Sequence, residues 1–368
     1  MKICQLDTPS LLIDREIMNS NLSAMQSYAN MQHVALRPHT KTHKMPYIAK
    51  RAVELGACGI AVAKTGEAEV MAGSGLRDIF IANEVVGPSK LSRITALAER
   101  ISISFGVDSA YHVEEAEKAF SAAGLTAEVL IEVEVGEVRC GIDSMDELFP
   151  LLDVLKKCPH VHLKGFFGHD GNTYSAESME KCREISRAAQ EKLVAFSDAA
   201  KAYGMTNTVV SYGSTPPLVN HFDIIPGITE IRPGTYALMD VSQGNAIGTL
   251  EHCAATVLAS VISRPAPDRV ILDVGAKGLT QQERTAGICN SGGKGRILGY
   301  TGVTIGRIFD EHAIIHDQAF RDKVHVGQKL RIIPVHICPV CNLYDTAALI
   351  SGDEVVDTLT VAGRGKLQ

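Results

Sequence analysis

The most constraining feature of this chain is a regular alternation of short apolar runs with amphipathic segments of helical length. Eight runs have the length and composition of buried strands, at residues 33–37, 58–63, 79–83, 101–106, 127–135, 161–167, 207–211 and 228–232. Helical segments lie between them, among them 66–73, 88–99, 111–123, 145–157 and 176–203. An α/β chain that repeats this unit eight times is expected to close into a (β/α)8 barrel of the TIM type. An open doubly wound sheet is the alternative. No Gly-x-Gly-x-x-Gly motif follows the first strand, which weakens a dinucleotide-binding function.

After about Asn245 the pattern changes. Strand-like runs separated by Gly and Pro turns lie at 253–262, 269–274, 296–308, 313–315 and 329–335. We therefore expect a barrel domain over residues 15–245 and a mostly-β domain over residues 246–368. A short apolar strand at 9–14 precedes the barrel, so residues 1–14 are expected to join the second domain. Asp14 is a candidate cap for a helix that runs to about Ala29.

Composition excludes several classes of function. The net charge is −6 and no long basic run occurs, so nucleic acid is not an expected partner. The first residues lack the apolar core of a signal peptide, and no apolar run reaches the ~18 residues of a membrane span. The nine cysteines show no disulfide-scaffold spacing, which favours reduced thiols and a cytoplasmic location.

The segment Arg37-Pro38-His39-Thr40-Lys41-Thr42-His43-Lys44 follows the first barrel strand. Neighbouring cations disfavour an ammonium ion, which lowers the pKa of Lys41 and makes it a candidate Schiff-base lysine. Residues two apart point the same way in an extended segment, so His39 and Lys41 are expected to face the barrel mouth together, with His43 as a further candidate. The alternative is a solvated basic loop that binds an anion or nothing.

Other unusual polar residues follow later strands, where a barrel carries its chemistry. Arg139 follows the fifth strand, His169 the sixth, and Arg232 the eighth. Gly213-Ser214-Thr215 and Gly234-Thr235 offer backbone N–H groups and hydroxyls to an anion, although each could be a tight turn that needs glycine. Together with Lys41, they favour a phosphorylated cofactor. His169 is a candidate base, hydrogen-bond partner or packed structural residue.

A second cluster lies near the C-terminus, in His336-Ile337-Cys338-Pro339-Val340-Cys341. In an extended segment, His336 and Cys338 would share one face and could bind Zn²⁺ or another borderline metal. Cys338 and Cys341 could instead be a redox pair, or two buried thiols beside a surface histidine. No second Cys-x-x-Cys is present to complete a four-cysteine zinc site.

Taken together, these motifs resemble the D-threonine aldolase and D-serine dehydratase family of fold type III pyridoxal phosphate enzymes. The resemblance covers nearly the whole chain, and it implies a Schiff base at Lys41 and a metal ion on His336 and Cys338. It also implies cofactor contacts from a set of residues: Lys41, His39, Arg139, Tyr174, Gly213, Ser214, Thr215, Arg232, Gly234, Thr235 and Tyr236.

The resemblance further implies an alanine-racemase-like barrel, a homodimer with a shared active site, and a divalent ion (Zn, Mn, Mg or Co). The implied activity is lyase chemistry on β-hydroxy D-amino acids, with His169 as candidate base. Retro-aldol cleavage to glycine and an aldehyde is favoured; dehydration of D-serine or 3-hydroxy-D-aspartate to a 2-oxo acid and ammonia is the alternative. Cys338 and the 168–174 loop are closer to the dehydratases, whereas the segments 232–236 and 253–265 are closer to the aldolases. A racemase and a non-enzymatic pyridoxal phosphate carrier are less favoured.

Overall fold

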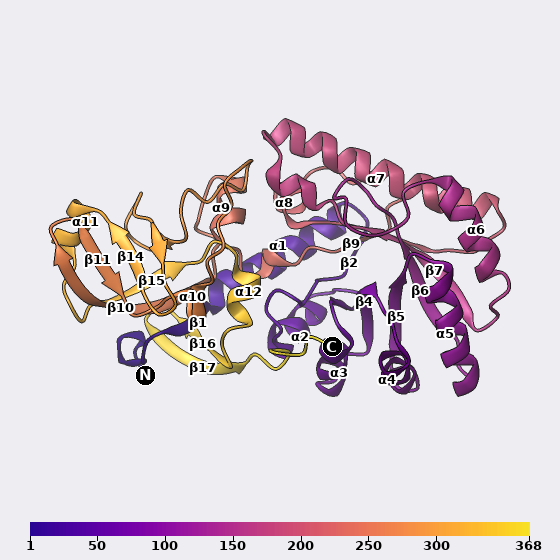
Figure 1. The fold of residues 1–368 in the computed structure, drawn as a ribbon, viewed down its shortest axis with the longest axis horizontal. Helices are drawn as coiled ribbons and strands as arrows, with labels where there is room; N and C mark the ends of the chain where they lie inside the picture. Colours follow the sequence, from indigo (N-terminus) through magenta and orange to yellow (C-terminus); the bar gives the residue numbers. More distant parts are fainter.

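The computed structural model describes residues 1–368, which form a barrel and a separate mixed sheet side by side (Figure 1). The barrel strands are β2 (Ala35–Leu36), β3 (Ile60–Val62), β4 (Asp78–Glu84), β5 (Ser102–Val107), β6 (Ala127–Glu132), β7 (Val161–Gly168), β8 (Val209–Tyr212) and β9 (Glu230–Ile231). All neighbouring pairs are parallel, and β9 pairs with β2. The eight predicted strands are therefore confirmed.

The barrel closes at the segment that carries Lys41. His39 and Ala61 form a parallel bridge, the amide of Ala61 donates to the carbonyl of Pro38, and the amide of Thr40 donates to the carbonyl of Ala61, both at 2.8 Å. These bonds join the end of β2 to β3. The open doubly wound alternative is thereby ruled out, because such a sheet has two free edges.

Helices alternate with these strands. They are α1 (Arg15–Met31), α2 (Pro46–Glu54), α3 (Thr65–Gly73), α4 (Pro88–Ala98), α5 (Ala110–Ala123), α6 (Met145–Leu155), α7 (Met179–Ala202) and α8 (Thr215–Val219). Asp14 caps α1 as expected, because its side chain accepts from the amide of Ile17 at 3.1 Å. The helix expected from residue 176 begins later, since Gly171–Ser175 form the 3-10 turn η2 and Ser178 caps α7. None of the helices is both long and apolar enough to cross a membrane.

Side-chain alternation along the strands gives the barrel a floor. Ala61, Phe80, Leu130 and Phe167 pack together as a small buried cluster, whereas their chain neighbours belong to the main hydrophobic core. Successive residues of a strand point to opposite faces, so this cluster is the inner layer and the main core lies between strands and helices. The inner layer fills the barrel below the strand ends.

The second domain is a nine-stranded sheet built around the N-terminal strand. Strand β1 (Ser10–Asp14) pairs antiparallel with β10 (Ala255–Ala266) and parallel with β16 (Thr346–Ser351). The remaining strands are β11 (Arg269–Leu272), β12 (Arg296–Ile297), β13 (Arg307–Ile308), β14 (Ala313–His316), β15 (Lys329–Ile333) and β17 (Glu354–Thr360). The N-terminal strand therefore lies inside this sheet, between two strands from the C-terminal third of the chain. The chain enters it through the short helix α9 (Val241–Ile247), which spans the boundary expected at residue 245.

Two sequence expectations in this domain are wrong. A single strand was expected at 296–308, but only two residues at each end of that range are strand, as β12 and β13. A turn interrupts the segment between them, with Gly299 at φ +84° and Gly302 at φ +81°. The segment after His336 is not extended: Ile337–Cys341 form the helical turn α12, so His336 and Cys338 do not share a strand face. The hairpin β16–β17, with Gly352 in the left-handed region, was not anticipated.

Candidate active site

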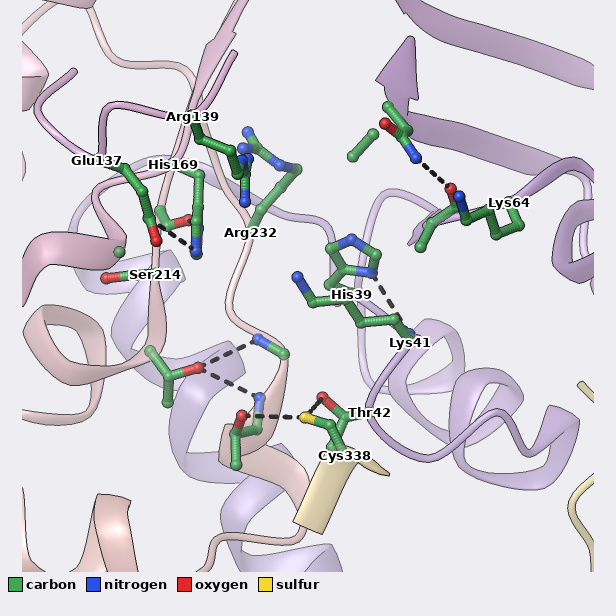
Figure 2. Close-up of a pocket in the computed structure, with 18 of the residues that line it drawn as sticks. His39, Lys41, Thr42, Lys64, Glu137, Arg139, His169, Ser214, Arg232 and Cys338 are labelled. Carbon is green, nitrogen blue, oxygen red and sulfur yellow. Dashed lines mark hydrogen bonds and ion pairs between the residues drawn. The ribbon is translucent and has the colours of Figure 1, made fainter. Parts of the chain in front are cut away.

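A cavity of about 910 Å³ lies at the C-terminal ends of the barrel strands and is lined by 30 residues, of which seven are hydrophobic. Residues of the β domain complete its wall (Figure 2). All the site residues expected from the sequence line this cavity except Tyr236, which is buried away from it with its hydroxyl unpaired. The structure thus gathers residues that are up to about 300 positions apart in the chain.

Lys41 is partly buried at the cavity wall, in the turn after β2. Burial lowers the pKa of its amine, and the nearby charges of Arg139 and Arg232 add to this, while the Cys338 thiol opposes it. The expected direction is confirmed, although burial rather than neighbouring cations is the largest cause. The amide of Lys41 donates to Nδ1 of His39 at 3.4 Å, which fixes that ring.

His43 does not join them. It is buried behind the cavity, and its Nδ1 accepts from the amide of Met45 at 3.0 Å, at the start of α2. Lys44 lines the cavity but is paired with the buried carboxylate of Glu67 at 3.0 Å. Lys41 is therefore distinguished from Lys44 by the absence of a carboxylate partner among the ion pairs of the structure.

Arg232 is fixed on the barrel floor at the end of β9. Its guanidinium donates to Oγ of Ser211 at 2.6 Å and to the carbonyl of Gly168 at 2.9 Å, and it stands 5.3 Å from the ring of Phe167. Ser211 in turn donates to Glu230, which also accepts from Arg37 at 2.6 Å. Burial lowers the pKa of Arg232 to about 10. This network fixes the orientation of a buried cation in the cavity that Lys41 also lines.

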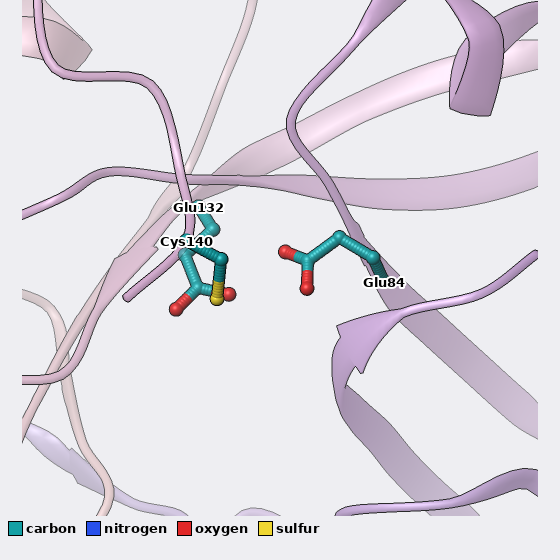
Figure 3. Close-up of side chains that lie close together, drawn as sticks. All are labelled: Glu84, Glu132 and Cys140. Carbon is teal, nitrogen blue, oxygen red and sulfur yellow. The ribbon is translucent and has the colours of Figure 1, made fainter. Parts of the chain in front are cut away.

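Arg139 comes from the loop after β6 and remains about half exposed, with its Nη2 atom 3.0 Å from Oε1 of Glu132. Glu132 belongs to a cluster with Glu84 and Cys140 (Figure 3), whose possible ligand atoms all lie within 4.8 Å of one another. Burial raises the pKa of Glu84 to about 8, so one carboxyl of the pair is protonated at neutral pH. A shared proton and the charge of Arg139 explain why two carboxyl groups lie so close. The sequence analysis did not single out Glu84 or Glu132.

His169 lies across the cavity, between two fixed partners. Its Nδ1 is 2.9 Å from the carbonyl of Gly213, which can only accept, so Nδ1 carries the proton and Nε2 has the free lone pair. Nε2 lies 3.6 Å from Oε2 of Glu137. Burial and the charge of Lys41 keep the pKa of the His169 imidazole well below its usual range. The ring is therefore neutral and suited to accept a proton.

The two glycine-containing turns form one wall. Thr215 Oγ1 accepts from the amides of Gly234 and Thr235, at 3.4 and 3.2 Å, and Ser214 Oγ lies 2.9 Å from the Thr173 hydroxyl. Gly213 has φ +148°, and a Cβ atom there would lie 3.1 Å from the amide nitrogen of Arg232. Small residues are needed because the two segments approach so closely. The result is a cluster of amides and hydroxyls at the cavity edge, which fits a phosphate group.

His336 and Cys338 reach the cavity from α12 of the β domain. Nδ1 of His336 donates to Oε1 of Gln282 at 3.0 Å, which leaves Nε2 free to bind a metal. Cys338 Sγ lies 3.2 Å from the Thr42 hydroxyl and 3.6 Å from that of Thr235. Cys341 is buried and both thiols are free, so the structure contains no disulfide between them.

Asp240, which the sequence analysis did not identify, holds this motif. One carboxylate oxygen accepts from the amide of Gln243 at 2.9 Å and caps α9, and the other accepts from the amide of Ile337 at 3.0 Å. Burial raises its pKa to about 6. The signal in the sequence was weak, since Asp240 lies about 100 residues before the turn that it supports.

The donor set fits both groups that the sequence implies. An amine with a lowered pKa, a buried arginine in the same cavity and an amide-rich turn suit pyridoxal phosphate. An imidazole nitrogen and a sulfur that face the same cavity suit a borderline divalent ion with positions left for water or substrate.

Two protein families match the chain. The family described as "Alanine racemase, N-terminal domain" matches residues 13–241, and the "Putative serine dehydratase domain" matches residues 254–350. The first contains the barrel and the second contains the His336–Cys338 motif.

Full-length relatives agree with these matches. The chain is 35% identical to D-threonine aldolase from Arthrobacter sp. over 367 residues, which are 99% of this chain and 94% of that protein. Its structure is similar to that of D-threonine aldolase from Filomicrobium marinum, with TM-score 0.91 and 28% identity, covering 100% and 98% of the two chains. D-threo-3-hydroxyaspartate dehydratase from Delftia sp. HT23 is equally similar, with TM-score 0.91, 28% identity and 98% of both chains covered. A cysteine-to-alanine mutant of that dehydratase is described as in its metal-free form.

Proposed function

The chain belongs to the D-threonine aldolase and D-serine dehydratase family of lyases, and from this premise we propose that it cleaves β-hydroxy D-amino acids into glycine and an aldehyde. The single observation that carries the proposal is that Lys41, His169 and the His336–Cys338 pair line one cavity. A substrate in this cavity can meet an amine, a neutral base and a metal ligand pair at once.

Pyridoxal phosphate is the proposed cofactor, held covalently through Lys41. When bound there, it would supply an electron sink for the bond that breaks at Cα. Gly213, Ser214 and Thr215 would hold its phosphate at the amide-rich wall, and Arg232 would offer a fixed positive charge in the same cavity. The lowered pKa of Lys41 supports this proposal, because only a neutral amine attacks an aldehyde.

A divalent ion on His336 and Cys338 is the second proposed group. When held there, it would supply a positive charge that makes a nearby substrate hydroxyl more acidic. A thiolate ligand favours Zn²⁺ over Mg²⁺, with Mn²⁺ and Co²⁺ between them. The hydrogen bond from His336 to Gln282 supports the proposal, since it leaves Nε2 free to bind an ion.

The roles of the protein side chains follow from their positions. His169 accepts the proton of the β-hydroxyl at Nε2, because Nδ1 is occupied by its bond to Gly213. The Cα–Cβ bond then breaks, and the β-carbon leaves as an aldehyde. Lys41 would return a proton to Cα, which completes glycine.

Dehydration is the second candidate, and Cys338 in the metal motif favours it through the similarity to the Delftia dehydratase. In that reaction Lys41 takes the α-proton and hydroxide leaves from Cβ, so His169 is not needed as the base. Racemisation is disfavoured, because it has no use for the His336–Cys338 pair.

One assay distinguishes these reactions. Purified protein loaded with pyridoxal phosphate and Mn²⁺ or Zn²⁺ is incubated with D-threonine and with D-serine. Glycine plus acetaldehyde from D-threonine supports the aldolase, whereas 2-oxo acid plus ammonia supports the dehydratase. Loss of either activity in EDTA, with recovery on metal addition, excludes a racemase.

Assembly and location belong to the proposal as well. A homodimer whose cavity is completed by the partner subunit is expected from the family resemblance, together with a cytoplasmic location. Light scattering after size-exclusion chromatography measures the first directly. A mass near 39.5 kDa would contradict it, since that is the mass of a single chain.

A further inference from the structure

Glu137 carries a carboxyl group into the cavity without a hydrogen-bond partner for its inner oxygen. Oε2 is buried and unpaired, and it lies 3.6 Å from Nε2 of His169, on the side of the ring that is free to accept a proton. The nearby Glu134 differs, because its carboxylate accepts the amides of Gly136 and Val138 and holds the loop itself. Glu134 has a structural role that Glu137 lacks.

The protein is shaped to hold this carboxyl group. Gly171 packs against it, and a Cβ atom at that position would occupy the space of the Glu137 carboxyl group. Gly136, at φ +117°, lets the loop pass close to Asn172, where a Cβ atom would lie 2.6 Å from the side-chain nitrogen. The loop after β6 and the turn after β7 therefore meet at glycines that leave room for Glu137.

We infer that Glu137 is a positioning residue that acts through His169: its carboxylate stabilises the imidazolium formed when Nε2 takes the proton of the substrate hydroxyl. The proton moves from the hydroxyl oxygen to Nε2, and Glu137 forms and breaks no covalent bond. This inference rests on the proposed function for the identity of the proton donor.

The charges around His169 explain why such a carboxylate is needed. The charged or titratable groups around the ring are Lys41, His39, Arg139, Arg232 and Glu137, and Glu137 is the one acidic group among them. Burial opposes a positive charge on the ring, and so do the charges of Arg139, Arg232 and, when it is protonated, Lys41. Burial raises the pKa of the Glu137 carboxyl group, whereas the charges of Arg139 and Lys41 oppose that rise. In its ionised form this group offers the compensating negative charge, 3.6 Å from the atom that gains the proton.

The test uses two variants that disturb this contact in different ways. Glu137→Gln removes the charge and keeps the shape, whereas Gly171→Ala keeps the charge and displaces the carboxyl group. Glu177→Gln, at an exposed position before α7, is the matched control for the loss of one negative charge. Either of the first two variants alone tests the inference if the other fails to fold.

The first readout is the titration of His169 itself, followed in histidine-labelled protein by the ¹⁵N shift of Nε2 and assigned with His169→Gln. We expect both variants to lower the imidazole pKa, by one to three units as is typical of losing an opposite charge at this range, so that the protonated fraction at a given acidic pH falls about tenfold or more. The control should titrate like the wild type. An unchanged titration in both variants would overturn the inference, whether or not the protein cleaves D-threonine.

The second readout is cleavage by the loaded enzyme. The same variants should lower kcat for D-threonine roughly ten- to hundredfold, with KM and cofactor absorbance close to wild type. This loss is smaller than the roughly 10²–10⁴-fold contribution of a general base, because His169 itself remains. A purely structural role would instead disturb Arg139 on the same loop and raise KM or release the cofactor. If the wild type cleaves no β-hydroxy D-amino acid, the proposed function fails, while the titration still decides whether Glu137 raises the proton affinity of His169.

Discussion

Cys338 Sγ lies 3.2 Å from Oγ1 of Thr42, the residue that follows Lys41 in the chain. This contact joins the helical turn α12 of the β domain to the turn at the end of β2 in the barrel. It brings the proposed metal motif to the proposed cofactor lysine within a single chain. The predictions below depend on this arrangement.

Asp240 is expected to control metal affinity without binding the ion. Its carboxylate accepts the amide of Ile337, between the two proposed ligands, so Asp240→Ala should loosen the turn that presents them. Metal affinity measured by titration calorimetry should fall about 10- to 100-fold, the usual effect of losing a supporting residue. The control is Asp322→Ala, since the Asp322 side chain is exposed and remote from the cavity. Equal affinities in the two variants would contradict this role.

Glu230 is expected to be a stability determinant of the barrel. It is buried and accepts from Arg37 and from Ser211, so Glu230→Gln leaves the Arg37 charge with only Asp78 as a partner. Removing one partner of a buried ion pair costs about 3–5 kcal/mol in unfolding free energy. Urea denaturation measures this cost. Glu128→Gln on β6, whose side chain is 36% exposed and pairs with His162, should cost under about 1 kcal/mol.

Glu230 is also expected to make the stability of the protein depend on pH. Arg37 and Ser211 hold the pKa of Glu230 below its usual value despite burial, which raises it. A carboxyl group whose pKa is depressed by folding stabilises the protein above its unfolded pKa, and this contribution is lost as pH falls through the folded pKa. Wild-type unfolding free energy should therefore drop between about pH 5 and pH 3 more steeply than that of Glu230→Gln. Parallel curves for the two proteins would be the contrary result.

Glu84 is expected to make stability depend on pH with the opposite sign to Glu230. Burial and Glu132 raise its pKa to about 8, so the folded protein holds a proton that the unfolded chain releases near pH 4.5. Stability should then fall as pH rises between these values. Glu84→Gln removes that proton and should show a smaller loss of unfolding free energy between pH 6 and pH 8.5. If the variant and the wild type lose the same amount, Glu84 is ionised in the folded protein.

Much of this architecture could be predicted from the sequence because it repeats. Buried parallel strands appear in a sequence as apolar runs. Eight such runs in alternation with helices are compatible with few folds. The cavity residues could be predicted for a related reason, since strand ends place Lys41, His169 and Arg232 on one rim. Tyr236 shows where that logic fails: it follows β9 directly, yet the 3-10 turn η3 (Thr235–Ala237) buries it away from the cavity.

Contacts between segments that are distant in the chain could not be predicted from the sequence. Asp240 supports α12, and Glu137 faces His169, only because the folded chain brings those segments together. Single-sequence periodicity carries no information on such contacts. The helical turn at Cys338 could not be predicted from its own residues. A Cys-Pro-Val-Cys segment favours neither strand nor helix strongly, and the hydrogen bond from the amide of Ile337 to Asp240, which holds the start of the turn, comes from a distant part of the chain.

The most direct test locates the cofactor on the chain. The protein is loaded with pyridoxal phosphate, reduced with borohydride, digested and sequenced by mass spectrometry. Three lysines line the cavity, Lys41, Lys44 and Lys64, so the position is informative. We predict a pyridoxyl group on Lys41, absent in Lys41→Ala. Modification of Lys44 or Lys64 instead, or of no lysine in the cavity, would contradict the central claim.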